Sequence, residues 1–160
     1  MRNLLVVYFS ETGHTARAAR DVALRLGGDL DRIVPLMPQK SSPLAKAFAA
    51  LMGREELVHN PARNPSEYAV VVIASPVWAG RLPPPVRGYL GKVKGRLGAV
   101  AFLVTCGGGG TRAAFRCMRD AAGRPPIAQV TITDADRRSG MDAGKLATFA
   151  DMLREERAAA

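Results

Sequence analysis

The sequence predicts an α/β fold in which helices cover both faces of one open, parallel, doubly wound β-sheet. Three observations lead to this prediction. Five short apolar segments recur along the 160 residues, and segments with helical spacing of apolar residues separate them. The apolar segments are nearly continuous rather than alternating, as in strands that are buried on both faces. No repeat or low-complexity tract interrupts this pattern, so we expect residues 1–160 to form a single domain.

Five segments have the composition of buried strands. Four strong ones cover residues 4–9, 69–75, 99–105 and 127–133, and a weaker one covers residues 30–36. Because strands and helices alternate along the chain, the sheet is expected to be parallel.

A helical pattern lies in each interval between these strands, and another follows the last strand. Gly27 and Gly28 follow the first helix, as glycines commonly do after a last turn. Residues 54–65 mix charges with two prolines and are expected to form a loop. The predicted helices cover residues 15–26, 43–52, 83–93, 111–122 and 140–157.

The helix predicted over residues 43–52 carries apolar side chains with two open interpretations. Phe48 and Met52 either pack this helix onto the sheet or border a substrate site. Apolar residues at helical spacing usually belong to a core, which favours packing on the sheet.

The segment SETGHT, residues 10–15, lies where the first strand passes into the first helix. It holds three hydroxyl side chains and a glycine, and no acidic residue follows in the first helical turn. The first N–H groups of a helix lack internal partners and carry the positive end of its dipole, so this corner predicts a phosphate site. A plain N-cap by Ser10 or Thr12 is the alternative. The predicted phosphate ligands are Ser10, Thr12, Gly13, His14 and Thr15.

Residues 8–15, YFSETGHT, resemble the phosphate-binding loop of the flavodoxins, which reads S/T-x-T-G-x-T after the first strand. The resemblance implies one non-covalently bound FMN, whose phosphate is held by hydroxyls and backbone amides. It also implies a three-layer sandwich with a five-stranded parallel sheet in the order 2-1-3-4-5.

The segment SPVWAG, residues 75–80, follows the third predicted strand and holds the chain's single tryptophan. An aromatic ring between a proline and a glycine offers a flat face to a planar ligand, although Trp78 folded onto the sheet is an alternative. The segment resembles the S/T-P-V/I-W-x-G loop of short flavodoxin-like proteins, which lies against the isoalloxazine ring. The residues that this resemblance assigns to the flavin are Pro76, Val77, Trp78, Ala79 and Gly80.

The segment CGGGGT, residues 106–111, follows the fourth predicted strand. Four consecutive glycines expose backbone amides to a ligand edge, or else form a flexible turn. The pattern T-C-G-G-x-G occurs in the third flavin loop of flavodoxin-like proteins. The residues that this resemblance places near the flavin are Cys106, Gly107, Gly108, Gly109 and Gly110. In the implied strand order, the three loops adjoin one another at the carboxyl ends of their strands.

A cysteine phosphatase is a less favoured alternative, because Cys106 and Arg112 form the signature C-x5-R. A thiolate at a helix N-terminus would be its nucleophile. This hypothesis leaves residues 10–15 and Trp78 without a role, and no aspartate is obviously placed as the general acid.

The composition limits the cellular compartments and the classes of partner that we expect. Two cysteines give neither a disulfide framework nor a metal spacing, and no apolar stretch approaches a membrane-spanning length, so we expect a cytoplasmic protein with no membrane span. The net charge is +9, but basic residues are scattered and only 6% of residues are aromatic, which makes nucleic acid an unlikely partner. Arg81 and Arg112 lie in or beside the predicted ring loops, without an acidic residue there, which would favour two-electron reduction.

Two functional classes follow from the sequence, and the oligomeric state stays open. In the first, the protein carries electrons through FMN and docks on a redox partner protein with an acidic surface. In the second, it is an FMN-dependent reductase that takes hydride from NAD(P)H and reduces a flavin or a small acceptor such as a quinone. A binding domain that has lost its flavin is a third, less favoured class.

Overall fold

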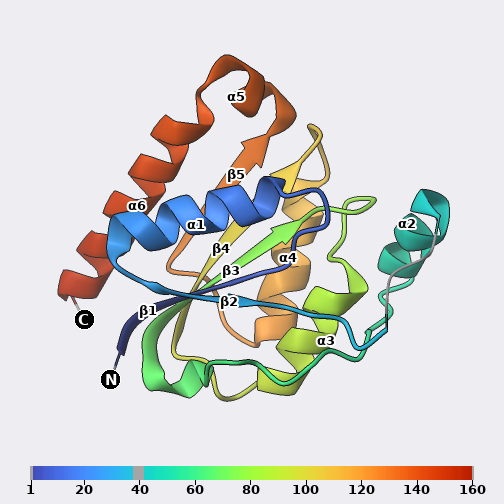
Figure 1. Cartoon of the computed structure of the whole chain (residues 1–160), viewed down its shortest axis with the longest axis horizontal. Coiled ribbons are helices and arrows are strands. Elements are labelled where there is room, and N and C mark those ends of the chain that lie inside the picture. Colours follow the sequence, from blue (N-terminus) through green and yellow to red (C-terminus); the bar gives the residue numbers. More distant parts are fainter. Residues whose placement is uncertain (1, 38–41, 160) are drawn as a thin grey trace.

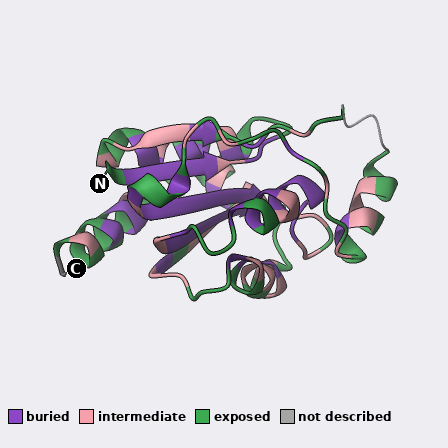
Figure 2. Ribbon diagram, turned by 90° about the horizontal axis from the view of Figure 1, so that it is seen from below, coloured by how far each residue is buried: buried purple, intermediate pink, exposed green. Residues whose placement is uncertain are grey.

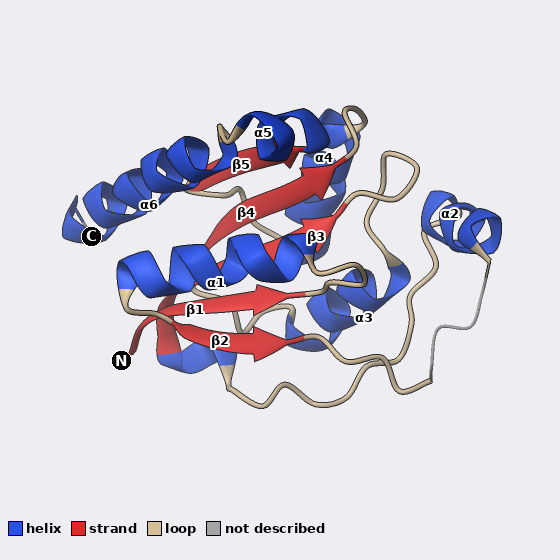
Figure 3. Cartoon of the chain, turned by 45° about the horizontal axis from the view of Figure 1, so that its top comes forward, coloured by secondary structure: helices blue, strands red, loops and turns tan. Residues whose placement is uncertain are grey.

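A computed structural model describes residues 2–37 and 42–159 of the chain. Its centre is a parallel sheet in the order β2-β1-β3-β4-β5 (Figure 3). The predicted order 2-1-3-4-5 is therefore confirmed. The strands are β1 (Arg2–Tyr8), β2 (Asp29–Arg32), β3 (Tyr68–Pro76), β4 (Ala99–Cys106) and β5 (Ala128–Thr133).

Strand β1 lies at the point where the order of the strands in the sheet reverses. It pairs with β2 on one side and with β3 on the other, with Leu5 opposite both Asp29 and Val71. The chain therefore leaves the carboxyl ends of β1 and β3 toward opposite halves of the sheet, which is where such folds form their ligand sites.

Helices cover both faces of the sheet (Figure 1). One face packs on α1 (His14–Leu26) and α6 (Asp142–Ala159), and the other packs on α3 (Pro84–Val93) and α4 (Thr111–Ala122). Because apolar side chains meet the sheet from both layers, its central strands are almost wholly buried (Figure 2). None of the helices in the described part of the chain is long and apolar enough to cross a membrane.

Helix α5 (Asp134–Ser139) is a six-residue element that the apolar pattern does not predict. It begins with a capping box: Asp136 N donates to Thr133 Oγ1 (3.1 Å), and Thr133 N donates to Asp136 Oδ2 (2.8 Å). Lys145 Nζ, from α6, donates to the same carboxylate at 2.8 Å. These polar contacts, rather than an apolar stripe, determine where the helix forms.

Helix α2 (Pro43–Leu51) does not cover the sheet, and it projects from one end of the molecule (Figures 1 and 3). Phe48 is 57% exposed and Met52 is 62% exposed, so the prediction that they pack on the sheet is wrong. The extended segment that follows packs against α3 instead: Glu56 N donates to Pro84 O (3.1 Å), and Val58 is buried in the core. A short 3-10 turn, η1 (Pro65–Glu67), then leads into β3.

Candidate functional site

The loops that follow β1, β3 and β4 meet around one cavity of about 170 Å³ at the carboxyl edge of the sheet. All three loops that the sequence singled out contribute to its wall. Thr105 and the first turn of α5, which the sequence analysis did not predict, complete the wall. The predicted site residues in the wall are Thr12, His14, Thr15, Pro76, Val77, Trp78, Cys106 and Gly107.

Helix α1 presents an uncapped N-terminus to this cavity. Gly13 takes the N-cap position with φ of +92°, and among the residues that the structure describes no side chain caps the N–H groups of the first turn. Ser10 Oγ accepts only from Gly13 N, at 3.1 Å, so the plain N-cap by Ser10 or Thr12 is wrong. The first turn holds no acidic side chain and keeps its N–H groups available to an anion.

Two buried hydroxyls fix the start of α1 against the end of β4. Thr15 Oγ1 and Thr105 Oγ1 lie 2.8 Å apart in a hydrogen bond, and both residues are less than 5% exposed. Thr105 is a functional candidate that the sequence analysis overlooked, although its signal was a polar residue near the end of an otherwise apolar strand. The pair holds one wall of the cavity in place.

Trp78 is presented by a two-residue hairpin. Trp78 and Arg81 exchange backbone hydrogen bonds of 3.0 and 2.9 Å, and Ala79 and Gly80 take positive φ values of 48° and 72° between them. The Trp78 ring is half-buried and meets the Phe9 ring edge to face, with centroids 5.8 Å apart. Trp78 thus packs on the sheet and lines the cavity, whereas Ala79 and Gly80 shape the turn.

The glycine loop contacts this hairpin directly. A Cβ on Gly110, whose φ is +77°, would lie 2.5 Å from Gly80 Cα, so the close approach requires glycine. Gly107 lines the cavity, whereas Gly108 and Gly109 are exposed and an added Cβ would meet nothing within 4 Å. The four glycines therefore have different roles in the structure.

Three solved structures with this architecture are distant from the chain in sequence. No family model matches the chain, and no curated protein matches it significantly. A flavoprotein from Lactobacillus acidophilus, crystallised with FMN, has a TM-score of 0.70 at 21% identity over 87% of this chain and 98% of its own. A candidate flavoprotein from Bacteroides eggerthii gives 0.71 at 24% identity, over 89% and 97% of the two chains. Oxidised flavodoxin 2 from Bacillus cereus gives 0.60 at 16% identity, over 96% and 99%.

The chain has a flavodoxin-like fold. The strand order of the sheet supports this fold, and so does the similarity to those structures, which extends over nearly their whole length. In the flavodoxin-like sheet the cavity lies at the switch point between β1 and β3.

Two ion pairs flank the cavity of this flavodoxin-like chain. Glu11 pairs with Lys46, which reaches the site from α2, and Asp134 pairs with Arg137 within α5. The Lys46 ammonium also lies 5.8 Å from the centre of the Trp78 ring, within cation–π range. The wall therefore carries both signs of charge.

The two arginines that the sequence places in or beside the ring loops do not line the cavity. Arg81 Nη1 lies 3.7 Å from Cys117 Sγ, toward α4, and Arg112 is exposed; neither residue lines the cavity. Asp134 contributes a carboxylate that the sequence analysis missed, because only three loops were considered. Its position directly after β5, at the same sheet edge, was the available signal.

The position of Cys106 argues against a cysteine phosphatase. Burial raises the pKa of its thiol above the ordinary value, and the nearby Asp134 raises it further, against a lowering hydrogen bond from the Gly108 backbone. A nucleophilic cysteine needs the opposite shift of its pKa. Since Arg112 is exposed and outside the cavity wall, the C-x5-R pattern does not form a phosphate site here.

Proposed function

We propose that this chain binds one FMN non-covalently at the carboxyl edge of its sheet and carries electrons through it. The observation that supports the proposal is the meeting of an uncapped helix N-terminus, a tryptophan hairpin and a glycine loop at one cavity. The flavodoxin-like neighbour crystallised with FMN supports the same choice of ligand.

The donor groups present fit a phosphate at one end of this site. The first-turn N–H groups of α1 offer backbone donors, and Thr12 adds an exposed hydroxyl beside them. Ser10 Oγ already accepts from Gly13 N, so its own hydrogen remains to be donated. In this proposal Ser10, Thr12, Gly13, His14 and Thr15 form the phosphate loop.

The remaining walls fit a planar ring that is only partly enclosed. Pro76, Val77 and Trp78 supply an apolar side, and Gly107 lets backbone approach the ring. The cavity of about 170 Å³ is smaller than the roughly 300–1,000 Å³ typical of enclosed ligand sites. We therefore infer a shallow site, whose open side suits electron exchange with a partner protein. FMN supplies the redox chemistry when bound, and these residues bind and orient it.

A reductase is the second candidate, and helix α2 is the observation that favours it. Lys46 links α2 to the cavity through Glu11 and Trp78, and Leu44, Phe48 and Leu51 of this helix are exposed. In this proposal the exposed apolar side chains of α2 help to bind a small aromatic acceptor such as a quinone. Steady oxidation of NAD(P)H by the FMN-loaded protein with a quinone would select the reductase. No turnover, with rapid electron exchange to an acidic redox protein, would select the carrier.

The phosphate loop is tested by Thr12→Glu, which places a carboxylate beside the proposed phosphate. We expect FMN affinity to fall at least about tenfold, equivalent to about 1.4 kcal/mol, because like charges repel at close range. The measurement is a fluorescence titration of FMN. The matched control is Thr148→Glu, an exposed threonine of α6 outside the cavity wall, which makes the same change in charge. Equal affinities of the two variants would contradict the assignment.

The cellular setting stays a prediction. We propose a cytoplasmic protein whose redox partner has an acidic surface, since the chain carries a net charge of +9. If so, the rate of electron exchange with that partner falls steeply as ionic strength rises.

A further inference from the structure

The two edges of the sheet differ in how their free sides are protected. Strands β2 and β5 are the outermost strands (Figure 3). An edge strand presents unpaired backbone N–H and C=O groups, and proteins usually protect such edges with charged side chains, proline, a bulge or a covering segment. An edge without this protection is a surface on which a further strand can pair.

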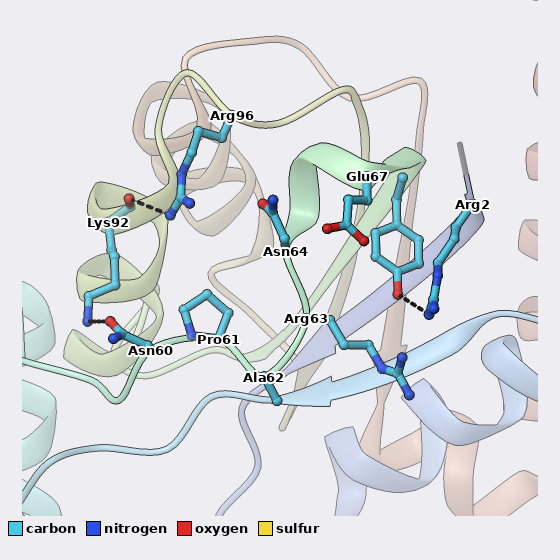
Figure 4. Close-up of a pocket in the computed structure, with 10 residues that line it drawn as sticks. Arg2, Asn60, Pro61, Ala62, Arg63, Asn64, Glu67, Lys92 and Arg96 are labelled. Atoms are coloured by element: carbon cyan, nitrogen blue, oxygen red, sulfur yellow. Dashed lines mark hydrogen bonds between the residues drawn. The ribbon is translucent and has the colours of Figure 1, made fainter.

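The edge at β2 is protected. Three of the four residues of β2 are charged. Arg63, from the segment before η1, lies beside this strand: its backbone N–H donates to Asp31 Oδ2 at 3.0 Å, and its Nε donates to Leu30 O at 3.3 Å (Figure 4). The same segment lines a cavity of about 610 Å³ at the amino edge of the sheet, together with Lys92. Charges and a covering segment therefore guard β2.

The edge at β5 has neither form of protection. The strand reads AQVTIT, without a charge or a proline. In the part of the chain that the structure describes, β5 pairs only with β4. Gln129 is exposed and Val130 and Thr131 are partly exposed, whereas β3 and β4 are almost wholly buried. The free side of β5 is thus open to another strand.

A groove of about 650 Å³ runs beside this open edge. Residues 129–131 of β5 form one wall, and a stripe along α6 forms the other. The stripe consists of Met141, Gly144, Thr148 and Met152, spaced by three and four residues. Met141 is 59% exposed and Met152 is 42% exposed. Gly144 leaves room for an incoming group, because an added Cβ would meet nothing within 4 Å.

The charge of the groove favours a second copy of the chain as its occupant. Among the described lining residues only Lys145 is charged, and its Nζ donates to Asp136 Oδ2 at 2.8 Å. Two copies with a net charge of +9 repel each other in general, but at this groove they meet without facing like charges. An acidic partner, in contrast, meets no unpaired cation among these lining residues.

We propose that two copies of the chain associate at this groove about a two-fold axis perpendicular to the sheet. Such an axis sets the two β5 strands antiparallel, so that their edges pair and the two sheets become continuous. It also keeps both α6 helices on the same face of that sheet. The stripe on α6 has a methionine at each end and small residues between them, so two antiparallel stripes place methionine beside methionine.

The size of the surface determines how tightly the copies associate. The groove has ten described lining residues, whereas a stable interface uses roughly 20–30 residues from each partner. We therefore expect a reversible dimer with a dissociation constant of roughly 10–100 µM. Because salt screens the repulsion between two basic molecules, the dimer should become tighter as ionic strength rises.

Sedimentation equilibrium of the purified chain, between about 2 and 300 µM, measures the association. The mass should rise from that of one chain to that of two. The result does not depend on bound FMN, because the groove and the FMN cavity share no lining residue among those described. A chain that remains monomeric at the highest concentration would overturn the proposal and leave this edge to a strand from a different protein.

Backbone hydrogen exchange locates the interface. At the higher concentration, amides of residues 128–133 should exchange several-fold more slowly, because β5 gains a hydrogen-bonded neighbour. Residues 29–32 of the protected edge are the internal control and should exchange at the same rate at both concentrations. A dimer that slows exchange at residues 43–51 of α2 instead, where other apolar side chains are exposed, would also overturn the proposal.

Matched methionine variants test the stripe on α6. Met141→Lys places a new charge at the interface in both copies and should raise the dissociation constant of the dimer at least about tenfold. The control is Met52→Lys, at a methionine of similar exposure, 62%, outside the groove, which should change the constant less than about twofold. Thermal unfolding of dilute samples checks that both variants are folded. Equal effects of the two substitutions would contradict the assigned interface.

Discussion

At the residue scale, the contact between Gly80 and Gly110 holds two of the site's loops together. Gly110→Ala places a Cβ 2.5 Å from Gly80 Cα at a φ of +77°. We expect the free energy of unfolding to fall by about 1 kcal/mol or more and FMN affinity to fall with it, because the loops must separate. The measurements are urea unfolding and FMN titration. Gly109→Ala is the control, since its Cβ meets nothing; an equal loss there would contradict the assigned contact.

The carboxylate of Asp136 predicts a defined dependence of stability on pH. The hydrogen bond from Lys145, followed by those from the Thr133 backbone and side chain, lowers the pKa of Asp136 to about 2. The folded state binds a proton at Asp136 less readily than the unfolded state does. The ionised carboxylate therefore contributes fully to the stability of the folded state above the ordinary pKa of 3.8, and this contribution is lost as pH falls toward 2.

The variant Asp136→Asn tests that contribution. At pH 7 the variant should unfold at a lower temperature than the unmodified protein, and the difference should shrink between about pH 4 and pH 2. Thermal unfolding at several pH values measures it. Asp151→Asn, at an exposed carboxylate of α6 that pairs with Arg154, should show little difference at any pH. If the difference in unfolding temperature between Asp136→Asn and the unmodified protein stays constant with pH, the pKa assignment is contradicted.

Sequence motifs predicted some residues of the site but not others. Thr15, Trp78 and Cys106 belong to sequence motifs that indicate a ligand, and all three line the cavity. Lys46 had no such signal, because it reaches Glu11 from a helix 35 positions away in the sequence. The separate roles of Gly107 and Gly110 also depend on a contact between loops, which one sequence does not show.

At the scale of elements, the two phenylalanines of α2 and α6 should respond differently to truncation. Phe149, in α6, is 1% exposed, and Phe149→Ala should cost about 3–5 kcal/mol of stability. Phe48, in α2, is 57% exposed, and Phe48→Ala should cost less than about 1 kcal/mol, since little buried area is lost. Urea unfolding measures both. Comparable losses would show that α2 packs on the molecule more closely than described.

The order and type of most elements followed from the sequence. Apolar runs predicted all five strands, and the bounds of α1, α3 and α4 agree within a residue or two. Helix α5 was missed because its six residues are held by a capping box and an ion pair rather than by an apolar stripe. For α2, apolar spacing predicted a helix with an apolar face, but spacing does not say what that face packs against.

At the scale of the whole molecule, the parallel sheet separates two cavities of different character. The carboxyl edge holds the loops, the α1 dipole and the mixed charges of the proposed FMN site. The amino edge holds the cationic cavity around Arg63 and Lys92. The net charge of +9 is distributed unevenly between these two edges: basic side chains outnumber carboxylates around the amino-edge cavity even when Asp29, which pairs with Arg2 and Arg63, is included, whereas the FMN site is flanked by balanced ion pairs.

The most direct test of the account is the absorbance spectrum of the purified chain after incubation with FMN and removal of the excess by gel filtration. The account predicts flavin bands that travel with the protein at one FMN per chain, and a lower FMN content in Thr12→Glu than in Thr148→Glu. A protein that emerges colourless, or one that retains flavin equally in both variants, would contradict the proposed site.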